Sequence, residues 1–410
     1  MIVQTGYNFK EFADKMAITG IIAEYNPFHN GHAFLIQELR KSGAGPIAVV
    51  LSGNFVQRGE AAILSKWART KQTLLCGADL VVELPLPWAV AGAERFASGG
   101  VFLVAALGAD RIGFGSECGD IGRLKQAADA LASPLLHDAM RAALDSGSTF
   151  AAARQQAVGS LFGSETASLL SEPNNILGIE YLKALERLHA SLRPFTIKRA
   201  GSGHNSRESA GGNASSAEIR ALLKKGADVS AYLPADAFRV LKAETERGRA
   251  PADLAYLERG ILAKLRRMSR QELSRVPDIS EGLENRVEAA VQKARSLEEL
   301  YRLVKSKRYP LARIRRILLS AFLEMDVSYC AGSPPYLRVL GIGKHGAEIL
   351  RKAKAQSPVP ILSRHAAARS LNRRAAKIWE LENRAADLYA LCMPQAAPCG
   401  FDRTNGVVVL

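Results

Sequence analysis

Two histidines three residues apart, His29 and His32, are the residues of this sequence best suited to chemistry. They flank Asn30 and Gly31 and follow an apolar segment that is typical of a β-strand. A helix beginning here would direct unpaired backbone N–H groups and a partial positive charge toward a bound anion. Both imidazoles could face that anion, which suits stabilising charge on an α-phosphate while pyrophosphate leaves. The alternative is a turn with two incidental histidines, which is disfavoured because the chain holds only seven.

The elements that must position this pair alternate along the first half of the chain. Short apolar segments predict strands at residues 17–23, 46–52, 79–83, 110–114 and 195–199. Helical patterns occupy residues 31–41, 65–76 and 91–107, with Ser65 as an N-cap. Strands separated by helices imply an α/β, Rossmann-like parallel sheet with helices on both faces. Such sheets bind ligands beyond the carboxyl ends of their strands, where the histidines would lie.

The second half of the chain has a different pattern. Amphipathic helices are expected from residue 226 to about residue 325, and short strands at residues 336–340 and 359–362. We therefore predict three parts: an N-terminal extension (1–15), a catalytic domain (16–225) and a mainly α-helical, basic C-terminal domain (226–410). Met16 is a plausible alternative start.

Positive charge is concentrated in that second part. The whole chain has a formal net charge of +15. Residues 226–410 hold 32 Lys and Arg against 20 Asp and Glu, whereas residues 1–225 hold 23 against 20. This asymmetry predicts a polyanionic partner, usually a nucleic acid. A generically basic, solvated surface is the alternative.

Several classes of protein are disfavoured. No apolar run approaches the roughly 20 residues that span a bilayer, and the N-terminus lacks the apolar region of a secretion signal. The sequence therefore predicts a cytoplasmic protein without membrane contact. The cysteines form no C-x-x-C pair, so neither a zinc site nor a disulfide framework is expected. They are Cys76, Cys118, Cys330, Cys392 and Cys399. The run 341–346 matches G-x-G-x-x-G, but no acidic residue follows about 20 residues later, so dinucleotide binding is not predicted.

Longer motifs give the histidine pair a family context. His29-x-Gly31-His32 resembles the HxGH signature of the nucleotidylyltransferase superfamily, which implies a nucleotidyltransferase fold. The full set of motifs resembles bacterial tRNA(Met) cytidine acetate ligases over nearly the whole chain after Met16. The motifs are EYNPFHNGH (24–32), SGNFVQRGE (52–60), SKWART (65–70), ADLVVELP (78–85), FGSE (114–117), PNNILGIEY (173–181), KRYPLARIRRILL (307–319) and YLRVLG (336–341).

The resemblance implies an activity that spacing alone does not give. That family activates acetate with ATP to form acetyl-adenylate and pyrophosphate, and then acetylates the wobble cytidine of elongator tRNA(Met). It implies ATP as a substrate, Mg²⁺ as its companion, and tRNA and acetate as partners. No metal ligand from the protein is predicted.

The resemblance also assigns residues. His29 and His32 would be catalytic. The nucleotide would contact Ile22, Ala23, Glu24, Tyr25, Asn26, Pro27, Phe28, His29, Asn30, Gly31, His32, Ala33, Phe34, Leu35, Gly115, Asn174, Asn175 and Arg199. As alternatives, Gly115 is a turn glycine, one of the two asparagines is an N-cap, and Arg199 is a surface ion-pair residue.

Three further expectations concern polar side chains. Ser215, Ser216 and Arg220 resemble the element that closes over phosphates, and a capping box fits them less well because Glu218 is not three residues after Ser216. Arg58 and Lys66 could neutralise pyrophosphate or contact RNA, and Glu83 could orient a histidine or help position Mg²⁺. Residues 302–316 carry seven basic residues and no acid. The predicted tRNA contacts are Lys305, Lys307, Arg308, Arg313, Arg315 and Arg316, with a solvated basic helix as the alternative.

Two other functions remain open. The first is an adenylyltransferase acting on a small-molecule cofactor precursor, which would leave residues 226–410 without a role. The second is an RNA-binding protein with a decayed nucleotide fold, which the intact His29, Gly31 and His32 argue against.

Overall fold

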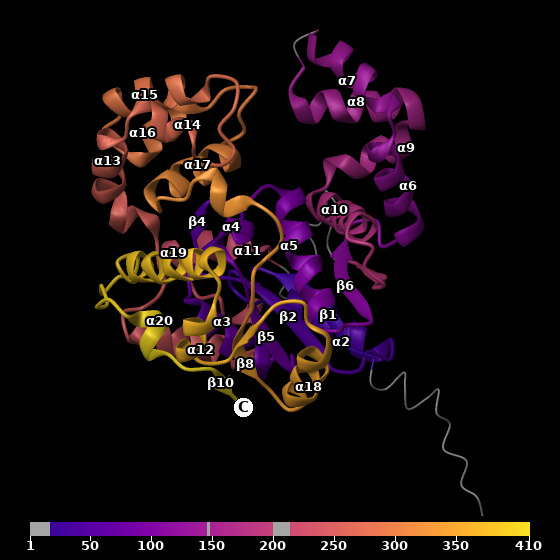
Figure 1. Cartoon of the computed structure of the whole chain (residues 1–410), viewed down its shortest axis with the longest axis vertical. Helices are drawn as coiled ribbons and strands as arrows, with labels where there is room; N and C mark the ends of the chain where they lie inside the picture. The colour runs from indigo at the N-terminus through magenta and orange to yellow at the C-terminus, as the bar shows by residue number, and fades with distance from the viewer. Residues whose placement is uncertain (1–16, 146–147, 200–213) are drawn as a thin grey trace, which may run out of the picture.

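The computed structural model describes residues 17–145, 148–199 and 214–410. The predicted N-terminal extension and most of the glycine-rich segment after Arg199 lie outside the described residues. At the centre of the molecule is a sheet flanked by helices (Figure 1). Its strands are β1 (Thr19–Ala23), β2 (Ile47–Ser52), β5 (Leu80–Leu84), β6 (Arg111–Ser116), β7 (Arg193–Lys198), β8 (Leu337–Ile342), β9 (Ile361–Leu362) and β10 (Val408–Val409).

The order of the strands places β1 at the point where the chain changes direction across the sheet. The order is β10-β8-β5-β2-β1-β6-β7, with β9 beside β8. β1 pairs in parallel with both β2 and β6, and β6 pairs in parallel with β7. The carboxyl ends of these strands therefore share one edge. A switch of this kind is where open α/β sheets bind ligands.

Helices cover both faces of the sheet. On one face, a Cβ at Gly20 of β1 would meet Val104, so α5 (Ala93–Ala106) approaches the strand closely. α10 (Pro173–Arg187) covers β6 on the same face. On the other face, α2 (Asn30–Lys41) packs against β6 and α3 (Lys66–Leu75) packs against β8. Because β2 and β5 are buried along their whole length, their sequences are almost continuously apolar.

These strands and helices confirm the predicted α/β class, and Ser65 is the N-cap of α3 as expected. No sequence pattern indicated that β8 would join the same sheet, where it pairs antiparallel with β5. β10 also joins that sheet from the far end of the chain. Residues from the second predicted part therefore complete the sheet of the first. The boundary at residue 225 stays a prediction.

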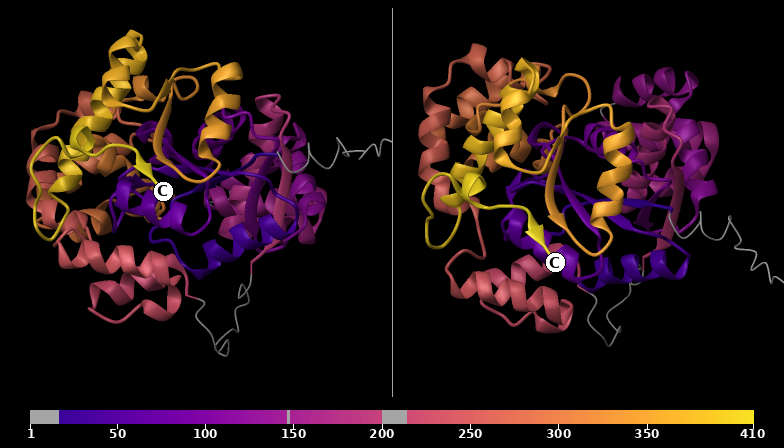
Figure 2. Two further views of the ribbon diagram at one scale, coloured as in Figure 1. Left: turned by 90° about the horizontal axis from the view of Figure 1, so that it is seen from below. Right: turned by 60° about the horizontal axis from the view of Figure 1, so that its bottom comes forward.

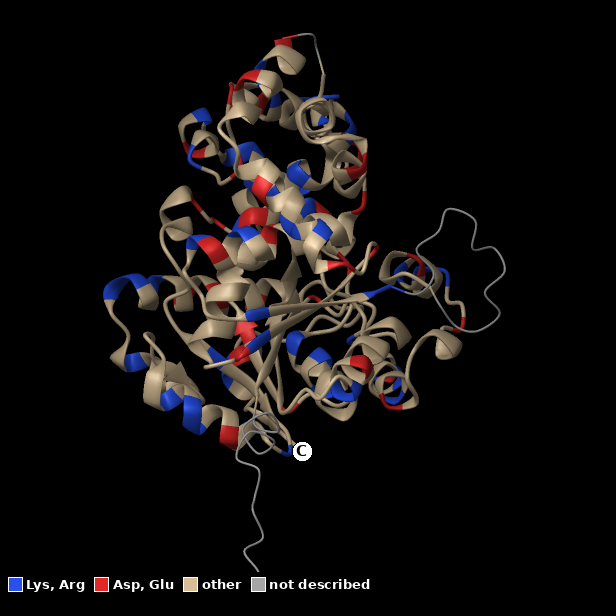
Figure 3. Ribbon diagram, turned by 90° about the vertical axis from the view of Figure 1, so that its right-hand side faces the viewer, with Lys and Arg blue, Asp and Glu red and all other residues tan. Residues whose placement is uncertain are grey.

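Two further groups of helices lie on opposite sides of Figure 1. One group contains α6 (Ile121–Ala132), α7 (Leu135–Asp145), α8 (Phe150–Phe162) and α9 (Ser164–Ser168). On this side of the molecule, basic and acidic residues are interspersed (Figure 3). The second group contains α13 (Glu258–Arg267), α14 (Arg270–Ser274), α15 (Leu283–Lys293), α16 (Leu297–Val304) and α17 (Leu311–Phe322).

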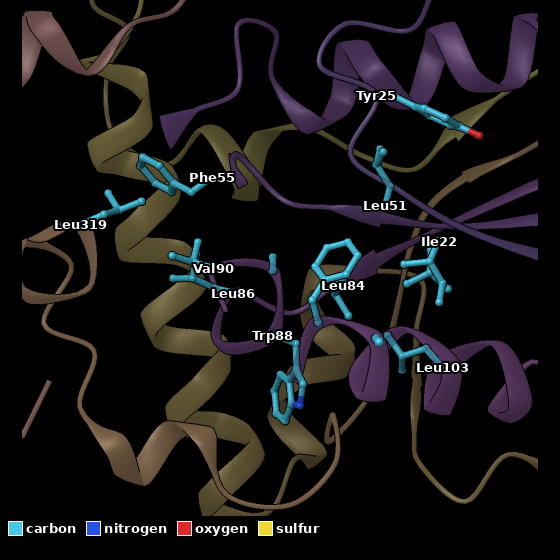
Figure 4. Packing of buried hydrophobic residues seen from close by; sticks show 14 of the residues in the cluster. Ile22, Tyr25, Leu51, Phe55, Leu84, Leu86, Trp88, Val90, Leu103 and Leu319 are labelled. Carbon is cyan, nitrogen blue, oxygen red and sulfur yellow. The ribbon is translucent and has the colours of Figure 1, made fainter. Parts of the chain in front are cut away.

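α17 is joined to the sheet through a short hairpin formed by β3 (Phe55–Val56) and β4 (Glu60–Ala61). Gly59 in its turn has a φ of +71°, and a Cβ there would lie 2.5 Å from the backbone of Arg315 and Arg316. Only glycine allows this approach. Phe55 and Leu319 belong to the same buried hydrophobic cluster (Figure 4). The helical group is thereby fixed to the loop that follows β2.

The glycines of residues 341–346 have a packing role. A Cβ at Gly343 would lie 3.0 Å from the carbonyl oxygen of Ala78, and one at Gly346 would lie 2.3 Å from that of Asp79. The segment between β8 and α18 (Gly346–Gln356) therefore lies directly against the start of β5. The spacing that resembles a dinucleotide motif is explained by backbone contact.

Candidate active site

The histidine pair begins α2 at the carboxyl end of β1. His29 is the N-cap, and its Nδ1 accepts a hydrogen bond from the backbone N–H of Gly31 at 3.1 Å. His32 reciprocates, since its Nδ1 accepts from the backbone N–H of His29 at 3.2 Å. The two rings stack with their centroids 3.7 Å apart. This arrangement is a capping box built from two imidazoles, and it fixes both rings at the helix N-terminus.

Burial and nearby groups determine the protonation state of the two histidines. Burial, with a contribution from Arg199, lowers the pKa of His29 to about 4. Burial, His29 and Arg199 lower the pKa of His32 well below its ordinary value. Both imidazoles are therefore neutral at pH 7. Because each Nδ1 accepts a hydrogen bond, each proton lies on Nε2, and that N–H is the donor left for a ligand.

Gly115 and Arg199 lie at the same edge of the sheet as the histidines. Arg199 follows β7, and its backbone N–H donates to the carbonyl oxygen of Ser116 at 2.9 Å. Its charge adds to the effect of burial in lowering the pKa of both imidazoles. Gly115 lies within β6, and a Cβ there would lie 3.2 Å from Cγ of Arg199. The interpretation of Gly115 as a turn glycine is therefore wrong.

The two asparagines belong to the first turn of α10, whose N-cap is Glu172. The alternative that one of them is the N-cap is therefore wrong. The Glu117 carboxylate accepts from the side-chain amide of Asn174 at 2.6 Å and from the backbone N–H of Asn175 at 2.7 Å. The Asn175 side chain is buried and accepts from the backbone N–H of Cys118 at 3.1 Å. Asn175 therefore fixes the loop after β6, and Asn174 is the more accessible of the two.

Arg69 is a central residue that we did not single out from the sequence. Its fully buried guanidinium donates to the carbonyl oxygens of Glu24 at 2.6 Å and Ser52 at 3.0 Å, and also to that of Gly53. Burial lowers its pKa to about 10. Arg69 thus ties the carboxyl ends of β1 and β2 together behind the histidine turn. The available signal was its place in the SKWART motif, but the carbonyl partners are backbone atoms that no sequence pattern reveals.

The start of α11 (Ser216–Lys224) corrects one expectation. Ser215 is the N-cap, and its hydroxyl and the Glu218 carboxylate form a complete capping box. A capping box was disfavoured because Glu218 is only two residues after Ser216. The N-cap is Ser215, three residues before Glu218, so that expectation was wrong. Arg220 lies inward, where Nη1 donates to the carbonyl oxygen of Asn26 at 3.0 Å. This contact brings α11 against the turn that leads to His29.

Lys66 and Glu83 also differ from expectation. Lys66 is buried, and its Nζ lies 2.8 Å from Glu83 and contacts Asp402. Arg338 lies 3.3 Å from Glu83 and 2.9 Å from Asp402. Burial alone would raise the pKa of Asp402, but Lys66 and Arg338 hold it below its ordinary value. The suggestions that Lys66 contacts pyrophosphate or RNA and that Glu83 positions Mg²⁺ are therefore wrong, because both side chains are used in a closed ionic cluster.

The six predicted tRNA contacts fall into two sets. On α17, the Arg313 guanidinium donates to the carbonyl oxygen of Asp278 at 2.8 Å, and Arg316 donates to the Asp278 carboxylate at 3.0 Å. Arg315 pairs with Glu60. Before the helix, Lys305, Lys307 and Arg308 are exposed, and Arg308 lies 2.7 Å from Glu281.

Comparison with known proteins agrees with this geometry. A family model described as HIGH nucleotidyl transferase matches residues 16–402. The tRNA(Met) cytidine acetate ligase of Thermoanaerobacter sp. (strain X514) is 39% identical over 404 residues, covering 96% of this chain and 100% of the relative. The ligase of the same name from Acetivibrio thermocellus is 36% identical over 415 residues, with the same coverage. The crystal structure of Thermotoga maritima TmcAL bound with α-thio ATP superposes with a TM-score of 0.89 at 29% identity, covering 96% of this chain and all of that one.

The parallel sheet and its histidine-capped first helix define a nucleotidyltransferase fold. Within this class, the chain belongs to the tRNA(Met) cytidine acetate ligase family. Among the described residues, no helix has the length and apolar character needed to cross a bilayer.

Proposed function

We propose that this protein is an ATP-dependent tRNA(Met) cytidine acetate ligase. A carboxylate oxygen of acetate attacks the α-phosphate of ATP, pyrophosphate leaves, and acetyl-adenylate forms. The N4 amine of the wobble cytidine then attacks the acetyl carbon, AMP leaves, and the amine loses a proton to give N4-acetylcytidine. The observation that carries the proposal is the stacked, neutral histidine pair at the N-terminus of α2, in a chain that matches relatives of this name along their whole length.

In this proposal the histidines act on the first step. The Nε2–H groups of His29 and His32 donate to the α-phosphate as charge develops on it, and the start of α2 adds its partial positive charge. Gly115, Asn174 and Arg199 contact the nucleotide at the neighbouring strand ends, together with residues 22–35. Ser215, Ser216 and Arg220 hold the phosphates from the start of α11. ATP as the nucleotide is supported by the analogue bound to the Thermotoga maritima protein.

Mg²⁺ would enter with ATP. In the part of the chain that the structure describes, no group of three His, Cys, Asp or Glu side chains is arranged to hold a metal ion. Mg²⁺ does not require such a group, because it is usually held by substrate phosphates, water and only one or two carboxylates. Its contribution when bound would be to neutralise phosphate charge.

The basic part of the chain is proposed to bind the tRNA. Its contacts would include Lys305, Lys307 and Arg308, whose exposed side chains can reach phosphates. The arginines of α17 would first have to exchange their contacts within the protein.

ATP–pyrophosphate exchange tests the first step. We expect exchange that requires acetate, and acetate-dependent formation of N4-acetylcytidine when elongator tRNA(Met) is added. Exchange that requires a nucleoside monophosphate instead of acetate would favour the small-molecule adenylyltransferase. Tight RNA binding without any exchange would favour a protein that only binds RNA.

A further inference from the structure

A cavity of about 250 Å³ lies between the β3–β4 hairpin, α11 and the basic helical group. Its walls come from β4, α11, the 3₁₀ turn Leu254–Leu257, α13, α16 and α17. Its charged and aromatic lining residues are Glu60, Arg220, Lys224, Asp253, Glu258, Glu298, Tyr301 and Arg315. Lys224 pairs with Asp253, and Glu258 accepts from the backbone N–H of Leu297. The cavity thus lies where the proposed catalytic and tRNA-binding parts of the chain meet.

Glu60 is the cavity carboxylate that faces both Arg315 and Arg220. Its carboxylate contacts the Arg315 guanidinium through one oxygen, and the other oxygen lies 3.7 Å from Nη2 of Arg220. The Glu60 side chain is 28% exposed. A carboxylate has about four lone-pair positions, so these two contacts leave Glu60 able to accept a further hydrogen bond.

Tyr301 supplies an aromatic wall. The guanidinium carbon of Arg315 lies 5.4 Å from the centroid of its ring, within cation–π range. Arg315 therefore holds both the carboxylate and the ring. The close approach of Gly59 to the backbone of Arg315 fixes this arrangement against β4.

Arg220 connects the cavity to the histidine site. One of its nitrogens donates to the carbonyl oxygen of Asn26 in the turn before His29, and another faces Glu60. One guanidinium therefore contacts both Glu60 and the turn that leads to His29.

The chemistry of these walls suits one nucleobase. An acidic side chain is the usual acceptor for the exocyclic N4 amine of cytosine, and guanidinium donors match its ring nitrogen and carbonyl oxygen. Tyrosine provides a stacking face for an unpaired base. The volume lies below the roughly 300–1,000 Å³ typical of drug-sized ligands, which suits a single nucleoside. We propose that this cavity receives the wobble cytosine and that Glu60 accepts a hydrogen bond from its N4 amine.

This inference rests on the proposed function, and kinetics with purified elongator tRNA(Met) test it. Glu60→Gln replaces the charged acceptor by a neutral amide oxygen and so weakens the hydrogen bond from the amine, which should lower kcat/KM for tRNA about 10-fold. Acetate-dependent exchange should change far less, because it does not require the cytosine. Glu246→Gln, an exposed position on α12 (Ala235–Glu246), is the matched control and should leave both rates unchanged.

Glu60→Gln could also displace Arg315 and Arg220, so a second pair of variants tests the cavity at Tyr301. Tyr301→Leu removes the stacking face and should lower kcat/KM for tRNA about 10-fold, whereas Tyr301→Phe should keep it. Wild-type kcat/KM in both Glu60→Gln and Tyr301→Leu would overturn the inference. An equal loss of exchange and acetyl transfer would also overturn it, because it would assign the cavity to pyrophosphate or the nucleotide. A wild-type protein without acetate-dependent exchange would overturn the proposed function itself.

Discussion

At the level of single residues, the chemistry of the two histidines depends on which ring nitrogen each one uses inside the protein. Nδ1 of His29 and Nδ1 of His32 accept backbone N–H groups, so Nε2–H of each ring is the available donor. The sequence predicted the pair because a strand, a turn and a helix start are local features. It could not predict the tautomer, which depends on the orientation of the rings, or Arg69, whose partners are carbonyl oxygens of residues up to 45 positions away.

Two substitutions of His32 test its Nε2–H donor while an acceptor for the His29 N–H is kept. The Oδ1 atom of asparagine can replace Nδ1 as the acceptor for the His29 N–H, but asparagine has no donor at the position of Nε2. His32→Asn should therefore keep the thermal midpoint near that of the wild type and lower acetate-dependent exchange about 10²- to 10³-fold. His32→Gln carries an amide N–H near the position of Nε2, and glutamine at the third helical position can still accept the N–H of His29, so it should retain more exchange than His32→Asn at similar stability.

Exchange assays and thermal unfolding of the two variants provide the measurement. Both variants should bind tRNA with nearly wild-type affinity, because neither removes charge from the basic part of the chain. Equal exchange rates in the two would contradict the assignment of Nε2 as the catalytic donor.

At the level of elements, α17 shows what a helical pattern can and cannot predict. Its periodicity predicted a helix and showed that several arginines lie along it. It did not reveal that Asp278 and Glu60, from distant segments, face those arginines. Similarly, Glu117 could not be identified as the partner of Asn174, because the two are 57 residues apart. Local patterns set the positions of elements, whereas contacts between elements determine which charges remain for a ligand.

This difference predicts two kinds of effect among the basic residues. Replacing both Lys305 and Lys307 by alanine removes exposed charges, so it should weaken tRNA binding and reduce the slope of log affinity against log salt by about 2. Arg316→Ala breaks the partly buried pair with Asp278 and should mainly lower thermal stability. Binding titrations over a range of salt concentrations, with thermal unfolding of the same variants, measure both effects. An unchanged salt slope in the double lysine variant would argue against this stretch as a tRNA contact.

At the level of the whole molecule, the two halves of the chain cannot be described independently. The sequence predicted the sheet from residues 17–199, but β8 and β10 come from residues 337–409. The short strand after residue 336 was expected, but not its partner. A strand pattern predicts which residues form a strand, whereas tertiary packing determines which neighbouring strand they pair with.

The ionic cluster around Asp402 provides a test of the contact between the C-terminal residues and the sheet. Asp402→Ala leaves Lys66 and Arg338 with one buried carboxylate fewer, and removal of one partner from such a cluster costs about 3–5 kcal/mol. We expect that loss in urea unfolding, together with reduced exchange, because α3 begins at Lys66 and carries Arg69. Glu380→Ala, an exposed acid on α19 (Arg373–Ala390), is the control and should change stability by less than about 0.5 kcal/mol. A wild-type unfolding midpoint for Asp402→Ala would contradict this account.

The pairing of β8 with β5 also has a consequence for the order of synthesis on the ribosome. At about 5–20 residues per second, the interval between the emergence of β5 and that of β8 is roughly 13–50 seconds. Throughout that time one edge of β5 is unpaired, and the cluster of Lys66 and Glu83 lacks Asp402. An unfinished chain thus has the histidine motif on a sheet whose β5 edge is still unpaired. The nascent protein is therefore expected to reach its full stability only when nearly all of it has been made.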